Sequence, residues 1–298
     1  MTDELPVTVP STCRKPQREK VSAVVVTYNR ETIVGTALAA LAFCDEIVVV
    51  DKSSTDTTPR IARKHADVVL SVAWSPVVED TRAYAVERAS HPWILLLDDD
   101  ECLSAQAARF VDSELRDPRA DAYRFARRHY ILGEHDERAY YWPEMHVQLF
   151  RKTAVELGAT VHSGIRPTTQ DVYDVPAGGG ICVHHLSHAN AAQWIEKTNR
   201  YTSQSDRLRV SADDDDLLAF AHARLDFWTA QSRAPGDSYV AAVAVLRGLY
   251  DIVDRIKSWE ETRSSGVDLL AQVCRKLEAT YATDLCDLAL PHGVSPER

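Results

Sequence analysis

A short apolar run that ends in four carboxylates constrains this chain more than any other stretch. Residues 94–97 (ILLL) have the composition of a strand that is buried on both faces of a sheet, and residues 98–101 (DDDE) follow it directly. Four carboxylates this close repel one another and raise one another's pKa, so packing alone does not explain them. A divalent cation would stabilise them together, because hard cations such as Mg²⁺ and Mn²⁺ take oxygen ligands and leave room for substrate phosphates. The alternative is a solvated acidic loop that merely follows a strand.

Two earlier β-branched runs end in polar residues in the same way. Residues 21–27 (VSAVVVT) break at residues 28–30 (YNR), and residues 46–50 (EIVVV) break at residues 51–54 (DKSS). Predicted helices separate these runs, so the pattern indicates βαβ units and a mostly parallel sheet. Ligands bind just outside the carboxyl ends of strands in open α/β sheets. We therefore expect the three sets of polar residues to meet at one edge of the sheet as a ligand site.

The remaining elements follow from hydrophobic periodicity and from helix caps and breakers. Further strands are predicted at residues 68–72, 121–132 and 146–150. Helices are predicted at residues 31–41, from the caps at 53–56 to residue 64, and at residues 81–89, 191–207, 217–231, 239–259 and 268–285.

Composition and charge argue against several classes of protein. The net charge of −10 over 298 residues argues against a general nucleic-acid binder, which would present a basic face, and against tight docking on anionic lipid. The six cysteines are scattered without any C-x-x-C pair, so neither a zinc site nor a disulfide framework is expected. This cysteine usage, the polar first segment and the lack of a long apolar run predict a cytoplasmic protein without a signal peptide or a membrane span.

Four blocks in order carry a resemblance to a known family. They read VVVTYNR, EIVVVDKSSTDTT, TRAYAVERA and WILLLDDDE, and the set resembles the family 2 glycosyltransferases of the GT-A type. Later blocks at residues 148–152 (QLFRK), 161–163 (VHS) and 197–207 (KTNRYTSQSDR) are similar to the bacterial lipopolysaccharide-core beta-1,4-glucosyltransferases. The ordered set, which covers roughly residues 21–207, is far more specific than any one block.

The resemblance implies a fold and a reaction. The fold implied is an α/β, Rossmann-like GT-A domain over residues 21–190, with a mostly parallel central sheet, between a flexible tail at residues 1–20 and a helical C-terminal extension at residues 191–298. The reaction implied is an inverting transfer of a sugar from a nucleotide-diphosphate donor, such as a UDP-hexose, to a hydroxyl acceptor. The acceptor implied is a cell-envelope glycan or a lipopolysaccharide-type glycolipid, and the cofactor is Mn²⁺ or Mg²⁺.

The resemblance also implies donor-binding roles at the strand ends. Thr27, Asn29 and Arg30 stand where the family's first loop contacts the nucleoside. Asp51 stands where a carboxylate accepts a hydrogen bond from the nucleobase, and Arg82 matches a basic residue near the nucleotide. From the residues alone, Thr27 and Asn29 are equally well explained as turn residues, and Arg82 as a solvated helix residue. Asp51 is the stronger candidate, because a lone carboxylate that closes a buried strand needs a partner.

The metal site is implied by the aspartates of the third block. The resemblance implies that Asp98 contacts the ribose and the metal and that Asp100 is a ligand of the metal. Asp99 adds a negative charge, which is expected to change how the site binds the sugar or the metal. The histidines that could add a metal ligand are His162, which matches the VHS block and is preferred, and His184, His185 and His188. Ser163 replaces the family's usual glutamate in that block, so a carboxylate role is lost or lies elsewhere.

Glu144 is the predicted catalytic base. It follows Trp142 and Pro143, just ahead of the strand at residues 146–150, where the family keeps an acidic residue. An aromatic, partly dry setting raises a carboxyl pKa toward neutrality, which suits proton abstraction from an acceptor hydroxyl. Half-buried sheet packing explains the aromatic residues at least as well. The rival bases are Asp99, Glu101 and Asp136.

The C-terminal helices have two interpretations. In the similar lipopolysaccharide glucosyltransferases the matching region is more apolar and more basic, whereas Asp226, Asp251 and Asp254 dilute that character here. Core packing in a helical appendage is the favoured interpretation, and peripheral contact with the inner face of the membrane is the other. The basic residues expected near the diphosphate or the acceptor are Lys197, Arg200 and Arg207.

Two other functions are weighed against glycosyl transfer. A catalytically inactive nucleotide-sugar-binding protein is permitted by the altered VHS block. A phosphohydrolase of the D-x-D-x-T kind would also place aspartates after a buried strand. It fits poorly, because Cys102 occupies the Thr position and that motif normally closes the first strand of its domain.

Overall fold

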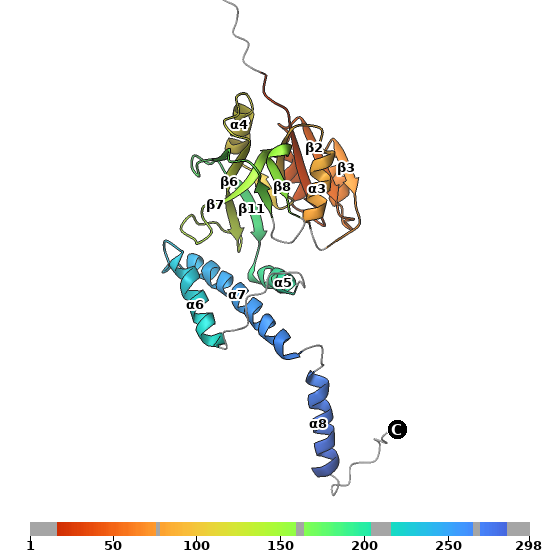
Figure 1. Cartoon of the computed structure of the whole chain (residues 1–298), viewed down its shortest axis with the longest axis vertical. Coiled ribbons are helices and arrows are strands. Elements are labelled where there is room, and N and C mark those ends of the chain that lie inside the picture. The colour runs from red at the N-terminus through yellow and green to blue at the C-terminus, as the bar shows by residue number, and fades with distance from the viewer. Residues whose placement is uncertain (1–16, 76–77, 159–163, 204–215, 265–268, 285–298) are drawn as a thin grey trace, which may run out of the picture.

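The computed structural model describes residues 17–75, 78–158, 164–203, 216–264 and 269–284. The strands of the main sheet in these ranges are β1 (Val21–Thr27), β2 (Glu46–Asp51), β3 (Val68–Ser71), β4 (Trp93–Asp98), β5 (Glu101–Leu103), β6 (Ala122–Ile131), β7 (Glu144–Arg151), β10 (Val172–Asp174) and β11 (Val183–His188). They pair in the order β3–β2–β1–β4–β7–β6–β11–β5, with β10 also beside β6 (Figure 1). A separate two-stranded sheet joins β8 (Val155–Leu157) to β9 (Ile165–Pro167).

The helices lie around this sheet and after it. They are α1 (Val34–Ala39), α2 (Thr58–Ala62), α3 (Glu79–Arg88), α4 (Ala105–Glu114), α5 (Ala191–Thr202), α6 (Leu217–Ala230), α7 (Ser238–Ser264) and α8 (Leu269–Asp284). Together the strands and helices form the expected mixed α/β fold with a helical C-terminal region.

The first half of the sheet is parallel, as predicted. β1 pairs in parallel with both β2 and β4, and β2 pairs in parallel with β3. The second half is mixed, because β7 runs antiparallel to β4 and β6, and β5 runs antiparallel to β11. β6 and β11 are parallel neighbours, so parallel pairs still predominate in the described sheet.

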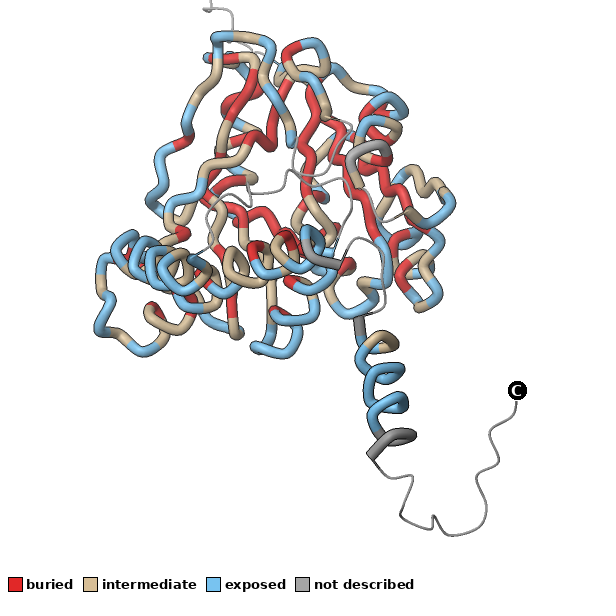
Figure 2. The backbone as a smooth tube through the Cα atoms, turned by 60° about the horizontal axis from the view of Figure 1, so that its bottom comes forward, coloured by how far each residue is buried: buried red, intermediate tan, exposed pale blue. Residues whose placement is uncertain are grey.

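Two buried layers explain why the central strands are apolar without interruption. Val25, Leu95 and Leu97 pack with α1 and α4 residues in one cluster, and Val24 and Leu96 pack with α3 residues in another. Successive residues of a strand point to opposite faces, so a strand covered on both faces must be apolar at every position. The buried tube of the central strands is visible in Figure 2.

Two of the differences between the observed elements and the sequence-based prediction bear on the site. Glu101 was predicted as one of four carboxylates that follow the end of a strand, but it begins a strand of its own, β5, and is fully buried. The strand predicted at residues 146–150 begins two residues earlier, so Glu144 is the first residue of β7.

The C-terminal helices pack partly on the sheet domain. α6 and α5 both contact α7, and a third apolar cluster joins α7 to the loop after β6. That cluster includes Ile131, Tyr141, Trp194, Val240 and Val243. α8 projects away from the rest of the molecule in Figure 1. Within the described ranges, no helix is long and apolar enough to cross a membrane.

Candidate active site

The loops after β1 and β2 are joined by Asn29. Its backbone is in the left-handed region with φ of 51°, which asparagine tolerates better than most residues. Its Oδ1 accepts a hydrogen bond from the backbone N–H of Thr55 at 2.8 Å, and its own N–H donates to Ser54 Oγ at 2.9 Å. Asn29 therefore fixes one predicted ligand loop against the other.

Asp51 lies beside a cavity at the end of β2. The cavity has a volume of about 290 Å³, and its lining includes Asp51, Ser53 and Ser54. Asp51 is 3% exposed, and its Oδ2 accepts a hydrogen bond from the Ser54 N–H at 3.1 Å. Its Oδ1 is buried and accepts no hydrogen bond from the described residues. A buried acceptor without a partner is unusual, and a ligand N–H would satisfy it.

Thr27 lies next to Asp51 across the sheet. The two residues are register partners in the β1–β2 pair, and Thr27 is buried. Its Oγ1 also has no hydrogen-bond partner among the described residues. The two oxygens give the end of β1 and β2 unused hydrogen-bonding capacity where the nucleoside was expected.

Asp98 and Asp99 bind different cations. Arg82 of α3 forms an ion pair with Asp98 at the end of β4. Asp99 accepts hydrogen bonds from Arg30 Nε and from the Tyr28 N–H, each at 3.0 Å. Burial raises the pKa of Asp99, and Arg30 opposes that shift. Asp99 therefore holds the loop after β1 in place, a structural role beside the substrate-binding role predicted for it.

Asp100 is the most enclosed aspartate of the three. Its side chain is 8% exposed, with Arg30 Nη2 at 3.5 Å from Oδ2 and His185 Nε2 at 3.5 Å from Oδ1. Its backbone carbonyl accepts a hydrogen bond from the Leu186 N–H at 2.8 Å. Burial alone would raise the pKa of Asp100, but His185, Lys197 and Arg30 outweigh it and hold that pKa below its usual range. Asp100 is an anion surrounded by positive or polarised groups.

Glu101 does not belong to a cluster of free carboxylates. Arg127 Nε lies 2.6 Å from Glu101 Oε1, and Oε2 accepts hydrogen bonds from the Asp98 N–H and from Gln148 Nε2, each at 3.0 Å. Burial raises the pKa of Glu101. The four consecutive carboxylates are therefore divided among three arginines, with Arg30 shared by Asp99 and Asp100. Across the described residues, no three His, Cys, Asp or Glu side chains are already grouped for a metal ion.

The donor set around Asp100 is compatible with a divalent cation. A carboxylate oxygen and an imidazole nitrogen 3.5 Å apart have the spacing of neighbouring ligands on one ion, because ligands about 2.0–2.6 Å from a cation at right angles lie roughly 3–4 Å from each other. Imidazole and carboxylate both suit Mn²⁺ and similar ions. Among the candidate histidines in the described residues, His185 comes within 3.5 Å of Asp100. Burial lowers the pKa of His188, and the charge of Asp100 nearby opposes that shift.

The pKa expected for Glu144 was wrong. His129 Nε2 lies 2.5 Å from Glu144 Oε2, and His146 Nε2 lies 3.2 Å from Oε1. Burial would raise the pKa of this carboxyl, but the two histidines outweigh it and hold the pKa well below the usual range. The aromatic neighbours in the sequence suggested a raised pKa, whereas the nearest polar groups come from β6 and β7. The base role of Glu144 itself stays a prediction.

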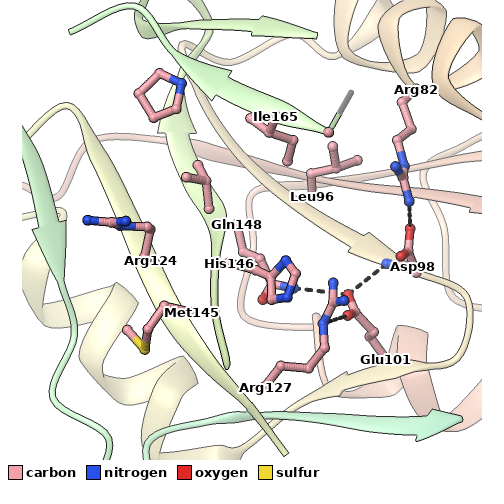
Figure 3. A pocket seen from close by; sticks show the side chains of 13 residues that line it. Arg82, Leu96, Asp98, Glu101, Arg124, Arg127, Met145, His146, Gln148 and Ile165 are labelled. Atoms are coloured by element: carbon pink, nitrogen blue, oxygen red, sulfur yellow. Dashed lines mark hydrogen bonds and ion pairs between the residues drawn. The ribbon is translucent and has the colours of Figure 1, made fainter. Parts of the chain in front are cut away.

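A second cavity lies on the α3 side of Asp98 (Figure 3). It has a volume of about 420 Å³ and extends from Arg82 and Asp98 past Glu101 to His146 and Gln148. Figure 3 shows Asp98, Glu101, Arg127 and His146 gathered in the lower part of the view, with Leu96 and Ile165 above them and Arg82 pointing down to Asp98. A mixed polar and apolar lining of this kind suits a sugar, which presents hydroxyls at its edges and C–H groups on its faces.

The other predicted residues divide into two groups. His162, Ser163 and Arg207 lie outside the described residues. Asp136 is in a loop, where Arg138 Nη2 lies 2.5 Å away, and it is not among the residues that line either cavity. His184 points to Tyr130, whose hydroxyl lies 3.0 Å from its Nδ1.

His129 is the residue that sequence reasoning missed. It lies on β6 and is 8% exposed, with its Nδ1 at 2.7 Å from the Nδ1 of His185 on β11. Burial lowers the pKa of His129 to about 4, although Glu144 acts in the opposite direction. The period-two pattern of β6 places it on the same face as Arg127, which was a usable signal. Its neighbours on β7 and β11 were not readable from the local sequence.

Comparison with known proteins identifies the domain. Residues 22–169 match the model of the family described as Glycosyl transferase family 2. This part of the chain is a family 2 glycosyltransferase domain. The polar loops after β1, β2 and β4 all lie inside the matched residues, whereas β10 and β11 of the same sheet lie beyond them.

Relatives of this glycosyltransferase include proteins with and without a named role. An uncharacterised glycosyltransferase of Rickettsia conorii is 26% identical over 199 residues, which cover 64% of this chain and 70% of that protein. The lipopolysaccharide core biosynthesis glycosyltransferase LpsC of Rhizobium meliloti is 32% identical over 162 residues, which cover 49% of this chain and 57% of LpsC.

Among solved structures, residues 1–349 of S. aureus TarS in complex with UDP are similar. The TM-score is 0.43 and the sequence identity is 13%, with 83% of this chain and 92% of that chain covered. A likeness of this size carries no conclusion about the activity of the present glycosyltransferase.

Proposed function

We propose that this protein transfers a sugar, with inversion, from a nucleotide-diphosphate donor to a hydroxyl group of an acceptor glycan. The observation that carries the proposal is the buried Oδ1 of Asp51, which has no partner among the described residues and lies beside a cavity at the end of β2. Asp98 and Asp100 lie in the neighbouring part of the sheet, at the end of β4. A uracil ring offers an N–H to such an acceptor, so UDP-hexose is the proposed donor. Thr27, Asn29 and Arg30 would surround the nucleoside, as the family resemblance implies.

A divalent cation, Mn²⁺ or Mg²⁺, is part of the proposal. Asp100 and His185 would bind the cation. Asp98 would either be a further ligand of the cation or contact the ribose of the donor. When bound, the cation neutralises negative charge on the departing nucleoside diphosphate. The side chains of Arg30 and Lys197 would add positive charge near the donor phosphates. Both residues lower the pKa of Asp100, so both lie close to the proposed cation site.

The transferred sugar and the acceptor are proposed to meet in the cavity of about 420 Å³ beside Asp98. Gln148 lines it and is 2% exposed, and its Nε2 already donates to Glu101. Glu101 and Arg127 would fix the orientation of Gln148 toward a sugar hydroxyl. The proposed base is Glu144, which would take the proton of the acceptor hydroxyl, and Asp99 and Glu101 are its rivals in the site.

The acceptor and the place of action are proposed from the relatives. LpsC is named for lipopolysaccharide core biosynthesis, so a cell-envelope glycan or glycolipid is the proposed acceptor class. Action in the cytoplasm at the inner face of the membrane would fit such an acceptor. We also propose that residues 21–190 form the catalytic domain and that residues 191–298 form a helical extension.

A ligand panel tests the donor and the cation. Thermal shift is measured with UDP-, GDP-, dTDP- and CMP-sugars, each with and without Mn²⁺. A ligand at 100 times its Kd should stabilise the fold by about 2.7 kcal/mol. We expect the largest shift with a UDP-sugar and Mn²⁺ together. Equal shifts with all nucleotides, or none, would contradict the proposal, and binding without transfer to any acceptor would favour an inactive nucleotide-sugar-binding protein.

A further inference from the structure

Four side chains from neighbouring strands form a continuous polar row. Glu144 Oε2 lies 2.5 Å from His129 Nε2, and His129 Nδ1 lies 2.7 Å from His185 Nδ1. His185 Nε2 then lies 3.5 Å from Asp100 Oδ1. The row connects a half-exposed carboxylate on β7 to the buried carboxylate after β4.

The strand pairing explains why these residues meet. His129 and His185 are register partners in the parallel β6–β11 pair. Glu144 is the register partner of Arg127, two positions before His129 on the same face of β6. His185 is in turn the partner of Glu101, the residue after Asp100. The backbone pairing of β6, β7, β11 and β5 therefore brings Glu144, His129 and His185 together and places Asp100, next to Glu101, at the end of the row.

The hydrogen-bond roles in the row are constrained by each other. An Nδ1-to-Nδ1 contact needs one nitrogen to donate and the other to accept. Glu144 as a carboxylate can only accept, so His129 donates to it from Nε2. A neutral His129 then accepts at Nδ1, and His185 must carry its proton on Nδ1. Because Nδ1 is committed to His129, Nε2 on the Asp100 side is the ring nitrogen of His185 that is left to bind a cation.

We propose that His129 and Glu144 are positioning residues that hold the His185 ring in the tautomer and orientation needed to bind the divalent cation. This inference rests on the proposed metal-assisted function. A ligand histidine normally donates its second ring N–H directly to a carboxylate, a backbone carbonyl or water, and here a second histidine, His129, stands between His185 and Glu144.

The packing around His129 supports a positioning role. Its ring meets the Tyr141 ring edge to face at a centroid distance of 5.3 Å and the His185 ring at 4.8 Å. Its backbone carbonyl contacts His135 Nδ1 at 3.0 Å. A buried ring enclosed in this way cannot turn freely, so it transmits the position of Glu144 to His185.

Binding of Mn²⁺ to protein saturated with UDP tests the inference. The free-ion signal of Mn²⁺ in electron paramagnetic resonance gives the affinity, after subtraction of a blank with UDP alone. Glu144→Met and His129→Leu should each lower Mn²⁺ affinity by roughly 10–100-fold, the usual effect of losing an outer-shell partner. Glu144→Gln should fall between Glu144→Met and the wild type, because an amide oxygen can still accept from His129 without a charge.

A matched control is available on the same strand. His184 neighbours His185 but contacts Tyr130 instead of the row, so His184→Gln should leave Mn²⁺ affinity unchanged. UDP affinity without metal and the melting temperature report whether each variant is folded. If His129→Leu does not fold, Glu144→Gln and Glu144→Met carry the test, since Glu144 is 48% exposed at the start of β7.

The outcomes separate this inference from the function on which it rests. Wild-type protein that binds no Mn²⁺ with UDP would overturn both. Wild-type binding with equal affinity in the Glu144 variants would overturn the positioning role alone. If the Glu144 variants kept the wild-type affinity for Mn²⁺ but lost kcat at saturating Mn²⁺, the positioning role would also be overturned. Glu144 would then be assigned to proton transfer.

Discussion

Arg82 of α3 forms an ion pair with Asp98 at the last position of β4. Both side chains line the cavity of about 420 Å³ on the α3 side of the sheet. Asp98 is thus separated from Asp99 and Asp100, which meet Arg30 on the other side. Three consecutive aspartates are stable together because Arg82 pairs with Asp98, Arg30 is shared by Asp99 and Asp100, and His185 also lies beside Asp100.

Replacement of Arg82 tests whether that ion pair prepares Asp98 for the donor. Arg82→Gln should weaken binding of the UDP-sugar about 10–150-fold, since a hydrogen bond to a charged group contributes roughly 1.5–3 kcal/mol. Calorimetry gives the affinity. Arg88→Gln is the control, because Arg88 is on the same helix but lies over the Tyr84 ring at 4.5 Å. Equal affinities for the wild type and Arg82→Gln would show that Arg82 is only a helix-surface cation.

Asp100 is predicted to be essential for metal-dependent turnover. Asp100→Ala should fold, because the backbone carbonyl at this position keeps its hydrogen bond from the Leu186 N–H, but Mn²⁺-dependent transfer should be lost. The rate of sugar release with and without Mn²⁺ measures this. Activity within about tenfold of the wild type, a barrier change of only ~1.4 kcal/mol, would contradict the metal role.

Asp51 is predicted to bind the nucleobase. Asp51→Ala should weaken UDP binding by roughly 1.5–3 kcal/mol through loss of one charge-assisted hydrogen bond. Titration calorimetry of UDP into both proteins decides the matter. Unchanged affinity would leave Asp51 with the Ser54 N–H as its only ligand and a purely structural role.

The catalytic base is tested by turnover at saturating Mn²⁺. Glu144→Gln keeps the shape of the side chain and removes the base, so kcat should fall by roughly 10²–10⁴ if the assignment holds. Glu101→Gln and Asp99→Asn are measured alongside, because burial raises the pKa of both carboxyls. Normal turnover of Glu144→Gln beside an inactive Glu101→Gln would move the assignment to Glu101.

Glu46 gives a prediction for stability against pH. Its Oε2 accepts from Ser22 Oγ at 2.5 Å and from the Ser90 N–H at 2.7 Å. Burial would raise the pKa of Glu46, but these hydrogen bonds outweigh it and lower the pKa. A carboxyl whose pKa is lower in the folded state stabilises the fold above its unfolded pKa, about 4.3, and loses that contribution as pH falls through the folded pKa.

Glu46→Gln should therefore lower the free energy of unfolding by roughly 1.5–3 kcal/mol at pH 7 and by much less at pH 3. Urea unfolding at both values measures the difference. Glu87→Gln, at a side chain that is 75% exposed, should have little effect at either pH. A cost for Glu46→Gln that did not depend on pH would contradict the lowered pKa.

Local sequence predicted the strands and the edge of the sheet, and non-local pairing decided the rest. β1, β2 and β4 are continuous apolar runs, so their ends and the place of Asp51 were readable directly. Glu101 was not predicted to begin a strand, because three residues have no strand signal of their own, and β5 forms only by pairing with β11.

The polar surroundings of Glu144 were unpredictable for the same reason. The neighbours in sequence are aromatic, but His129 comes from another strand and lowers the pKa that the aromatic residues were expected to raise. The contact between His129 and His185 joins residues 56 positions apart. No periodicity in either strand gives the register between them.

The pairing of β11 sets the shortest piece of chain that can keep the site. A fragment that ends at residue 169, where the family match ends, lacks β11 and leaves open backbone edges on β5 and β6. Exposed edges of this kind pair with other chains, so such a fragment would aggregate or lose β5. It would also lack the Leu186 N–H that holds the Asp100 carbonyl. The independently folding unit must therefore extend at least to His188, beyond the stretch by which the family is recognised.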